Sequence, residues 1–379
     1  MNNTGLKLKK KRILLIGPVY PYRGGIAHFT TALAEELKQS GQSVDIISYK
    51  WQYPAFLYPG KSDKDHSPNR QKPDADYILS SLNPLDWQKT FRKIQELKPD
   101  LVIFQWWVSI WAPAYHSLFK KLNKANIPFK LLVHNTYPHE TKGMDKKLAH
   151  FALKHATDYI AMTQREANKL QELLHKEVRV QIVPHPIYQA FPSSGLSKEE
   201  ARANLGLLPN VPVILFFGFV RAYKGLDLAI ESIAELKKRN KDAQLLVAGE
   251  FWEDLGKYQK QIADLGIQDY VKIVADYIPD DQASQYFEAS DCFIAPYRDA
   301  TQSGSVKLAM GYALPVVVSD VVADDFLRQM KDDCWVVPTE NIPLLCDALE
   351  ACLKQTKAGK TAQNVIKETW RAFIQAIIA

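Results

Sequence analysis

Residues 12–39, RILLIGPVYPYRGGIAHFTTALAEELKQ, decide the fold class. They begin with an apolar run over residues 12–17, continue through a loop with two adjacent glycines, and end in a helical pattern over residues 26–39. An apolar run of this kind is typical of a strand that is covered on both faces of a parallel sheet. The stretch therefore predicts a β-strand, a glycine-bearing loop and an α-helix in succession.

The same rhythm continues along the chain and predicts an α/β protein with two Rossmann-like parallel-sheet domains. Further strands are expected at residues 44–48, 101–105, 129–134, 158–163 and 178–183, and then at 213–218, 244–249, 271–275, 292–296, 315–319 and 334–337. Helices are expected at 112–123, 144–155, 165–175, 225–239, 254–264, 280–288, 305–311 and 343–355. Residues 51–72 break the pattern and indicate a long loop.

We expect a first domain over residues 1–190, a second over residues 191–360, and a C-terminal helix over residues 361–379 that can cross back onto the first domain. Open parallel sheets bind ligands at the carboxyl ends of their strands. Two such sheets that face a central cleft favour an enzyme with two substrates over a simple binding module.

Composition narrows the class of protein. The chain has 379 residues, of which 46% are hydrophobic and 24% charged, as in globular proteins. Part of the net charge of +6 comes from a basic run near the N-terminus, which can be a solubilising flank or can attract an anionic lipid or substrate. That run consists of Lys7, Lys9, Lys10, Lys11 and Arg12. No basic stripe recurs along a helix, which argues against nucleic-acid binding.

The four cysteines form no CxxC pair, so we interpret them as reduced core thiols and not as a disulfide framework or a zinc site. The first 20 residues lack the apolar stretch of a signal peptide, and no apolar run reaches the roughly 18 residues that span a bilayer. We therefore expect a cytoplasmic protein, with peripheral contact at the inner membrane face as an option.

Two glycine-bearing loops follow apolar strands. Gly24 and Gly25 come just before a helix, where free N–H groups favour an anion, although turn chemistry alone also explains such a pair. The loop is not GxGxxG, so a dinucleotide dehydrogenase is poorly supported. In the second half, Gly218 ends a strand and is followed by Arg221 and Lys224. These two cations can neutralise a diphosphate leaving group without a metal.

Residues 295–305, APYRDATQSGS, follow another apolar strand and open a helix. Asp299 offers a carboxylate in this loop. Ser303, Gly304 and Ser305 offer hydroxyls and helix-terminal N–H groups that can hold a donor's phosphate or ribose. The alternative for Ser303 is that it merely caps the helix.

His134 ends a strand of the first half, where it can donate to a sugar hydroxyl or be a hydrogen-bonded packing residue. His185, between two prolines, is expected to be a hinge residue. Trp106, Trp107 and Trp111 follow another strand, and either contact an acceptor or a membrane interface, or pack in the core. His139 and Glu140 form a His–carboxylate pair, but no further ligand recurs at metal spacing, so no metal site is expected.

These motifs together resemble glycosyltransferase family 4, whose members are retaining enzymes with the GT-B fold, and the resemblance covers most of the chain in order. Gly24-Gly25 resembles the family's N-terminal glycine loop, and His134-Asn135 its interdomain histidine segment. Residues 163–166, TQRE, match its helix start after a strand. Residues 218–224 are similar to its diphosphate motif, and residues 309–317 to the segment after its acidic motif.

The resemblance implies a nucleotide-sugar donor, UDP- or GDP-linked in most members, and a glycan, lipid-linked or small-molecule acceptor. It also implies retention of the anomeric configuration, with no metal or other cofactor. Asp299 resembles the first of the family's two glutamates and would position the transferred sugar. The second, which usually grips the donor's ribose, falls at Lys307 or Leu308, and neither is acidic. A branch of the family carries a Thr-Gln-Ser-Gly loop here, so Ser303, Gly304 and Ser305 would supply the grip instead.

Two other classes of function stay open. The first is a nucleotide-sugar epimerase or a phosphorylase of similar architecture. An epimerase would need paired acid–base carboxylates, and only Asp299 is a clear candidate. A catalytically silent sugar-nucleotide-binding subunit is suggested by the missing second acid.

Overall fold

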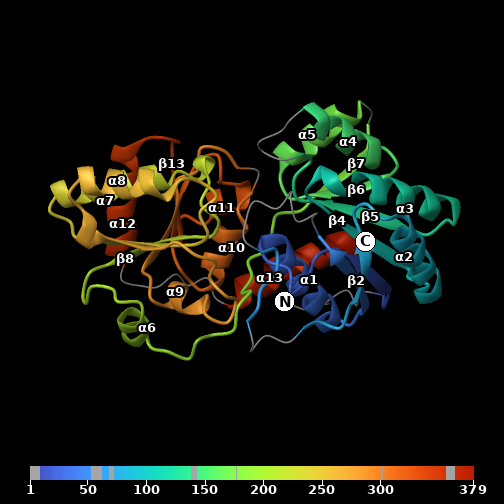
Figure 1. Cartoon of the computed structure of the whole chain (residues 1–379), viewed down its shortest axis with the longest axis horizontal. Coiled ribbons are helices and arrows are strands. Elements are labelled where there is room, and N and C mark those ends of the chain that lie inside the picture. Colours follow the sequence, from blue (N-terminus) through green and yellow to red (C-terminus); the bar gives the residue numbers. More distant parts are fainter. Residues whose placement is uncertain are drawn as a thin grey trace, which may run out of the picture. The chain divides into compact units, whose positions relative to one another are not determined.

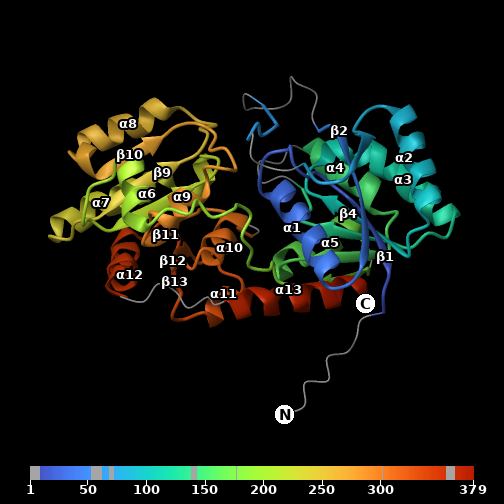
Figure 2. The same cartoon turned by 90° about the horizontal axis from the view of Figure 1, so that it is seen from below.

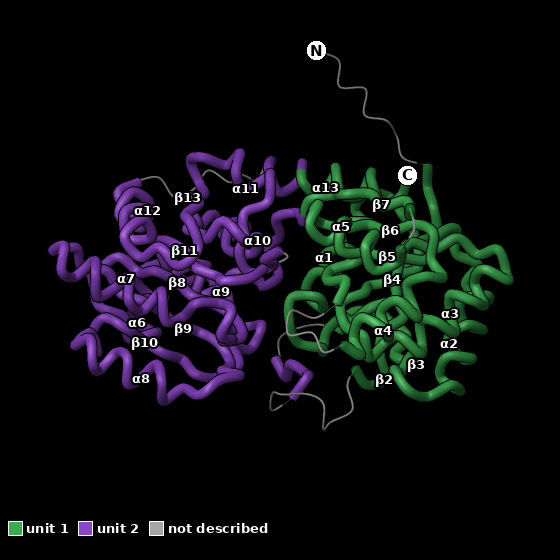
Figure 3. Tube along the Cα trace, turned by 90° about the horizontal axis from the view of Figure 1, so that it is seen from above, with its two compact units in different colours: residues 1–58, 72–184, 369–379 green, residues 59–71, 185–368 purple. Residues whose placement is uncertain are grey.

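The computed structural model describes residues 9–52, 62–67, 72–137, 143–175, 177–300, 302–355 and 363–379. The chain forms two compact units, which Figure 3 shows in green and purple. Unit 1 consists of residues 1–58, 72–184 and 369–379, and unit 2 of residues 59–71 and 185–368. Residues 59–71 thus belong to unit 2, although they lie inside the range expected for the first domain.

Unit 1 is built on a parallel sheet of seven strands in the order β3-β2-β1-β4-β5-β6-β7. The strands are β1 (Arg12–Ile16), β2 (Ser43–Trp51), β3 (Asp76–Ser80), β4 (Leu101–Trp106), β5 (Phe129–Val133), β6 (Asp158–Ala161) and β7 (Arg179–Ile182). β1 lies between β2 and β4, so that Ile13 pairs with Val44 on one side and with Leu101 on the other. The strand order therefore reverses between β1 and β4, which is where doubly wound sheets bind ligands.

Helices cover both faces of this sheet (Figures 1 and 2), which explains why its central strands are apolar throughout. They are α1 (Gly25–Gln39), α2 (Pro84–Leu97), α3 (Ala112–Lys124), α4 (Gly143–Leu153), α5 (Gln164–Leu174) and the short helix η2 (Ser109–Trp111). The last part of α13 (Gln363–Ile378) also belongs to unit 1. Its Trp370 and Phe373 rings lie 5.8 and 5.6 Å from the ring of Phe29 on α1.

Unit 2 repeats the topology with six parallel strands in the order β10-β9-β8-β11-β12-β13. They are β8 (Val213–Phe217), β9 (Gln244–Ala248), β10 (Val271–Val274), β11 (Cys292–Ala295), β12 (Val316–Ser319) and β13 (Cys334–Val337). Here the order reverses between β8 and β11, which pair directly. The loops after these two strands are thereby brought side by side at one edge of the sheet.

The helices of unit 2 are α6 (Lys198–Asn204), η3 (Ala222–Lys224), α7 (Leu226–Lys238), α8 (Leu255–Asp264), η4 (Gln268–Tyr270), α9 (Ser284–Glu288), α10 (Gly304–Gly311), α11 (Asp325–Gln329) and α12 (Ile342–Lys354). All four cysteines are buried thiols of this unit, and the Sγ atoms of Cys292 and Cys352 are 3.1 Å apart. Among the described residues, no helix is both long and apolar enough to cross a membrane.

Candidate functional site

The loops after β8 and β11 form the centre of the candidate site in unit 2. The turn that connects η3 to α7 lies directly on the loop after β11, and it can do so because residue 225 is glycine. Gly225 has φ +66°, and a Cβ there would lie 2.2 Å from the carbonyl oxygen of Pro296. Gly218 has φ +107°, a backbone conformation that residues other than glycine rarely adopt.

Both candidate cations are carried by this first loop. The Arg221 guanidinium lies 5.1 Å from the centre of the Trp252 ring, and the Lys224 Nζ lies 5.6 Å from the centre of the Tyr297 ring. The Lys224 ammonium also lies 3.5 Å from the place of a Cβ on Gly218, at the start of the same loop. The structure thus brings Lys224 to the start of its own loop and to the loop after β11.

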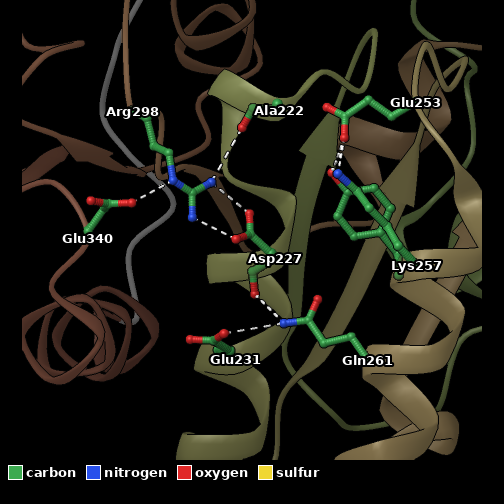
Figure 4. Close-up of polar contacts among 9 residues, drawn as sticks. Ala222, Asp227, Glu231, Glu253, Lys257, Gln261, Arg298 and Glu340 are labelled. Carbon is green, nitrogen blue, oxygen red and sulfur yellow. Dashed lines mark hydrogen bonds and ion pairs between the residues drawn. The ribbon is translucent and has the colours of Figure 1, made fainter.

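Arg298 fastens the two loops together, as Figure 4 shows. Its guanidinium donates two hydrogen bonds to the carboxylate of Asp227 at the start of α7, at 2.8 and 2.6 Å. It also donates to Glu340 at 2.6 Å and to the carbonyl of Ala222 at 3.3 Å, while its backbone N–H donates to Tyr223 O at 2.6 Å. Sequence reasoning quoted Arg298 without giving it a role.

The two charges of this clamp respond to each other. Burial raises the pKa of Asp227, but the hydrogen bonds and positive charge of Arg298 outweigh that effect, so its pKa lies below the usual range. The hydrogen bonds from Arg298 to Asp227 raise the pKa of the guanidinium further. The pair therefore stays ionised at neutral pH, and the loops stay joined.

The start of α10 holds the predicted serines. Ser303 is its N-cap, and its Oγ accepts a hydrogen bond from the Val306 N–H at 3.3 Å, which was the alternative role considered for it. The Ser305 Oγ lies 3.0 Å from the Ser303 Oγ and 3.1 Å from the hydroxyl of Tyr297. Gly304 lies between them, where a Cβ would approach the hydroxyl of Tyr188 to 3.3 Å.

Two further residues complete this loop. Asp299 is half-buried beside Arg298, and Thr301, which belongs to the family-branch motif, lies outside the described residues. The side-chain oxygen of Gln302 is buried and has no hydrogen-bond partner among the described residues. A buried carbonyl oxygen normally accepts a hydrogen bond, so Gln302 marks a place for a ligand donor. Its signal in the sequence was only its position in a strand-end loop.

Lys307 and Leu308, the two positions where the resemblance can put the second glutamate, are both buried on α10, and Lys307 forms an ion pair with Asp324 at 3.0 Å. Burial lowers the pKa of this lysine, although Asp324 opposes the effect. His185 lies near the same pair and is also buried, and burial lowers its pKa to about 4. At Lys307, α10 thus carries a lysine whose charge is balanced by Asp324, and not a carboxylate.

In unit 1, the predicted glycine loop follows β1 at the point where the strand order reverses. Gly24 has φ +99° and is the N-cap of α1, with no side chain bonded to the helix end. A Cβ on Gly25 would meet no atom within 4 Å. The two glycines therefore serve different purposes: Gly24 permits the turn, whereas Gly25 leaves open space in front of the helix.

His134 follows β5 and is buried. Its Nε2 atom lies 2.6 Å from the Oε1 atom of Gln105 at the end of β4, and its ring packs edge-on against Phe29 at 5.3 Å. The amide nitrogen of Gln105 is buried without a hydrogen-bond partner among the described residues, so it is a further candidate donor to a ligand.

The loop after β5 is fixed by the predicted helix start. Thr163 caps α5 by accepting a hydrogen bond from the Glu166 N–H, and the buried Glu166 carboxylate accepts one from the Thr136 N–H at 2.6 Å. His139 and Glu140 lie outside the described residues. Among the residues that are described, no group of three or more His, Cys, Asp or Glu side chains is arranged to hold a metal ion.

The three tryptophans lie in the core of unit 1. Trp106, Trp107 and Trp111 are 1%, 9% and 1% exposed. The Trp111 ring stacks on Tyr49 at 3.9 Å, and the Trp106 Nε1–H donates to Thr136 O at 3.0 Å. Because protein covers their rings, the three tryptophans are core residues here and not an acceptor platform. The sequence could not separate the two roles, since aromatic residues after an apolar strand occur both in binding loops and in the core.

Comparisons with known proteins agree with this arrangement. Residues 23–190 match the model of Glycosyltransferase Family 4, and residues 211–355 match that of Glycosyl transferases group 1. The chain is 33% identical over 188 residues to the lipopolysaccharide core biosynthesis mannosyltransferase LpsB of Rhizobium meliloti, a match that covers 46% of this chain and 51% of LpsB. The chain thus spans about half the length of this curated relative.

A longer match is to the putative teichuronic acid biosynthesis glycosyltransferase TuaC of Bacillus subtilis, which is 24% identical over 340 residues, 82% of this chain and 81% of TuaC. Among solved structures, HepE of Anabaena in complex with UDP-glucose superposes with a TM-score of 0.63 at 15% identity, over 97% of this chain and 95% of HepE. Its likeness concerns the fold. From the two family models, the two repeated parallel sheets and these relatives, we conclude that the chain belongs to glycosyltransferase family 4 and has the GT-B fold.

Proposed function

We propose that the protein is a retaining glycosyltransferase that moves a sugar from a nucleotide-sugar donor to a glycan, lipid-linked or small-molecule acceptor. The observation that carries the proposal is the pair Arg221 and Lys224 on the loop after β8, beside the loop after β11 and the start of α10. Cations and helix-terminal N–H groups at a strand-order reversal suit a nucleoside diphosphate.

In this proposal the bond between the anomeric carbon and the diphosphate oxygen breaks, and the acceptor oxygen bonds to the same face of that carbon. Negative charge builds up on the departing diphosphate, and Arg221 and Lys224 stabilise it electrostatically. The acceptor's hydroxyl proton passes to a departing phosphate oxygen, so no separate base is needed. Asp299 positions the transferred sugar. In unit 1, His134 is assigned to a sugar hydroxyl group. Because the cations supply the charge, the reaction needs no metal ion.

The donor's diphosphate and ribose are assigned to Ser303, Gly304, Ser305 and the side-chain oxygen of Gln302, for which the described residues supply no hydrogen-bond partner. The two serine hydroxyls contact each other, and they can accept a hydrogen bond from a ribose hydroxyl or donate one to a phosphate oxygen. A UDP- or GDP-sugar is the expected donor, and HepE bound to UDP-glucose supports a nucleotide sugar. The mannosyltransferase and teichuronic acid relatives support a glycan acceptor, which we assign to unit 1.

The proposal is tested first by a thermal-shift panel of UDP-, GDP-, ADP- and CMP-sugars, because a ligand that binds only the native state raises its apparent stability. With the donor identified, Arg221→Ala and Lys224→Ala should each lower turnover tenfold or more, a loss of about 1.4 kcal/mol of transition-state stabilisation. Lys238→Ala, on the last turn of α7, is the control. Turnover that is unchanged in both loop variants would remove the diphosphate assignment. Turnover that is abolished by EDTA and restored by magnesium or manganese would contradict metal independence.

One observation favours a second candidate, a silent sugar-nucleotide-binding subunit. The two positions at which the family's second glutamate can fall hold Leu308, which is apolar, and Lys307, whose charge is balanced by Asp324. A silent subunit would show a donor-dependent thermal shift but neither donor hydrolysis nor transfer to any acceptor. Slow release of the free sugar or its transfer would exclude this candidate, whereas release of an epimer without an acceptor would favour an epimerase.

A further inference from the structure

A basic groove lies on unit 1 between α4 and α5, beside the loop after β5. It encloses a cavity of about 500 Å³. Its polar lining comes from both helices and from the loop after β5, namely Tyr137, Lys146, Lys147, His150, Lys169 and His175. Glu172 is the acidic side chain among the described lining residues. The proposed transfer reaction uses none of these side chains.

The lysines of the groove differ in their surroundings. Lys169 forms an ion pair with the buried Glu166 at 2.8 Å, and its Nζ lies 5.6 Å from the centre of the Tyr137 ring. Lys146 is exposed, and its Nζ lies 5.0 Å from the same ring. Lys147 is exposed as well. Lys169 is therefore partly neutralised, whereas Lys146 and Lys147 leave the groove attractive to an anion.

The outer face of α4 adds apolar surface beside these charges. Met144 and Phe151 are 69% and 39% exposed, although both are large and hydrophobic. With Lys147 and Lys154, which are also exposed, they follow each other at intervals of three, four and three residues. This spacing puts all four side chains on one stripe of the helix.

The neighbouring helix extends the same kind of surface. α3 packs against α4, and Figure 1 shows α3, α4 and α5 following one another in unit 1. α3 carries the exposed Lys120 and Lys124 and has no acidic residue in its sequence, whereas its Lys121 donates to Gln88 of α2 at 2.5 Å. The His116 ring on α3 stacks on Phe151 at 3.8 Å, which holds the phenyl ring at the surface. The surface therefore combines several cations with exposed apolar side chains.

We propose that this α3–α4–α5 surface docks on an anionic phospholipid bilayer, with a headgroup phosphate in the groove and with Met144 and Phe151 in the interface. Lysines near an anionic membrane are attracted to its surface, and apolar side chains on the same helix face add hydrophobic contact. A soluble anion would use the lysines but would have no use for Met144. The proposal goes beyond the proposed function and does not depend on the donor or on the transfer chemistry.

The test is sedimentation of the full chain with vesicles of phosphatidylcholine alone and with added phosphatidylglycerol, at low and high salt. Binding should require phosphatidylglycerol. The double variant Lys146→Gln/Lys147→Gln should bind about twenty-fivefold more weakly at low salt, because each lysine near the surface contributes about fivefold. The matched control is Lys237→Gln/Lys238→Gln, a second pair of consecutive helical lysines, in α7 of unit 2. It should bind like the wild type.

Met144→Ser should weaken binding at both salt concentrations, because hydrophobic contact is not screened. Since Met144 is mostly exposed, this variant should melt like the wild type. Equal vesicle binding by the wild type and the Lys146/Lys147 variant would overturn the proposal. The proposal would also be overturned if the wild type bound no vesicles but showed a thermal shift with inorganic phosphate that the Lys146/Lys147 variant lacks. The groove would then be a site for a soluble anion. The donor-induced thermal shift should persist in every variant, which separates failure here from failure of the proposed function.

Discussion

Arg298 illustrates what a single residue contributes to this site. It is held by Asp227, Glu340 and the Ala222 carbonyl, and it thereby joins the loop that carries Arg221 and Lys224 to the loop that carries Asp299. Figure 4 shows these contacts converging on one guanidinium. We interpret Arg298 as a positioning residue, because each of its polar contacts described above goes to a protein group.

Arg298→Lys should weaken donor binding about fivefold, because a lysine keeps the charge but cannot form the forked contact with Asp227. The pair is partly exposed, so its loss should cost only about 1 kcal/mol of folding stability. Isothermal titration with the donor that the thermal-shift panel identifies measures the loss of donor binding. Thermal melting measures the loss of folding stability. Asp227→Asn should behave alike, and the double variant should be no worse than either single one, since both remove the same contact. Additive losses in the double variant would refute the clamp.

At the scale of elements, the turn between η3 and α7 fixes where the cations stand. Gly225 ends η3 and begins α7 in a left-handed conformation, in contact with the Pro296 carbonyl. The turn at Gly225, between η3 and α7, thus packs against the residue that follows β11. The loop after β8 is held in place by backbone geometry as well as by Arg298.

Gly225→Ala should destabilise the protein by more than about 2 kcal/mol, because the new Cβ would need both a left-handed conformation and space that the Pro296 carbonyl occupies. Gly25→Ala is the matched control. Its Cβ would meet no atom within 4 Å, so the free energy of unfolding should change by no more than about 0.5 kcal/mol. Denaturant unfolding of both variants measures this. Similar stabilities would show that the turn can relax.

Several elements were predicted closely, and others were missed for a physical reason. β1, β4 and β9 begin at the residues that the apolar runs indicated. β3 and α2 were not predicted. β3 is the edge strand of its sheet and is only half-buried at Asp76, Tyr77 and Ile78, so its sequence lacks a continuous apolar run. The short helices α6 and α11 were also missed, because they are too short to show a periodicity.

On the scale of the whole molecule, His185 is the first residue of unit 2, and it is buried near Lys307 and Asp324. Its folded-state pKa of about 4 lies below the value of 6.5 of an exposed histidine, chiefly because of burial, with a further lowering by Lys307. Between these two values the unfolded chain binds a proton that the folded chain does not. Stability from this group is therefore fully present above pH 6.5 and is lost as the pH falls towards 4.

We expect the free energy of unfolding to fall by about 1.4 kcal/mol per pH unit from this residue alone within that window. Denaturant titrations from pH 7.5 to 4.5 on the wild type and on His185→Gln measure it, since glutamine does not titrate. The difference between the two curves should narrow as the pH falls. A constant difference would mean that folding does not shift the pKa of His185. Other carboxylates and histidines contribute equally to both curves.

The sequence by itself determined the class of fold and the family. Alternating apolar runs and amphipathic segments are a local property, because a strand buried on both faces must be apolar wherever it lies in the chain. The same local pattern made it possible to select candidate site residues, because each lies in a loop that follows such a strand. These residues are Gly24, Gly218, Arg221, Lys224 and Ser303. Their roles in donor binding stay predictions.

Tertiary structure alone decided which distant residues meet. The pairing of β8 with β11 brings Arg298 to Asp227, 71 residues apart in the chain. Packing also buries the side-chain oxygen of Gln302, which has no hydrogen-bond partner within the described part of the chain. The burial of Trp106, Trp107 and Trp111 and the pairing of Lys307 with Asp324 were likewise decided by packing. The physical reason is that burial and ion pairing depend on contacts between segments far apart in sequence, whereas strand and helix patterns depend on near neighbours.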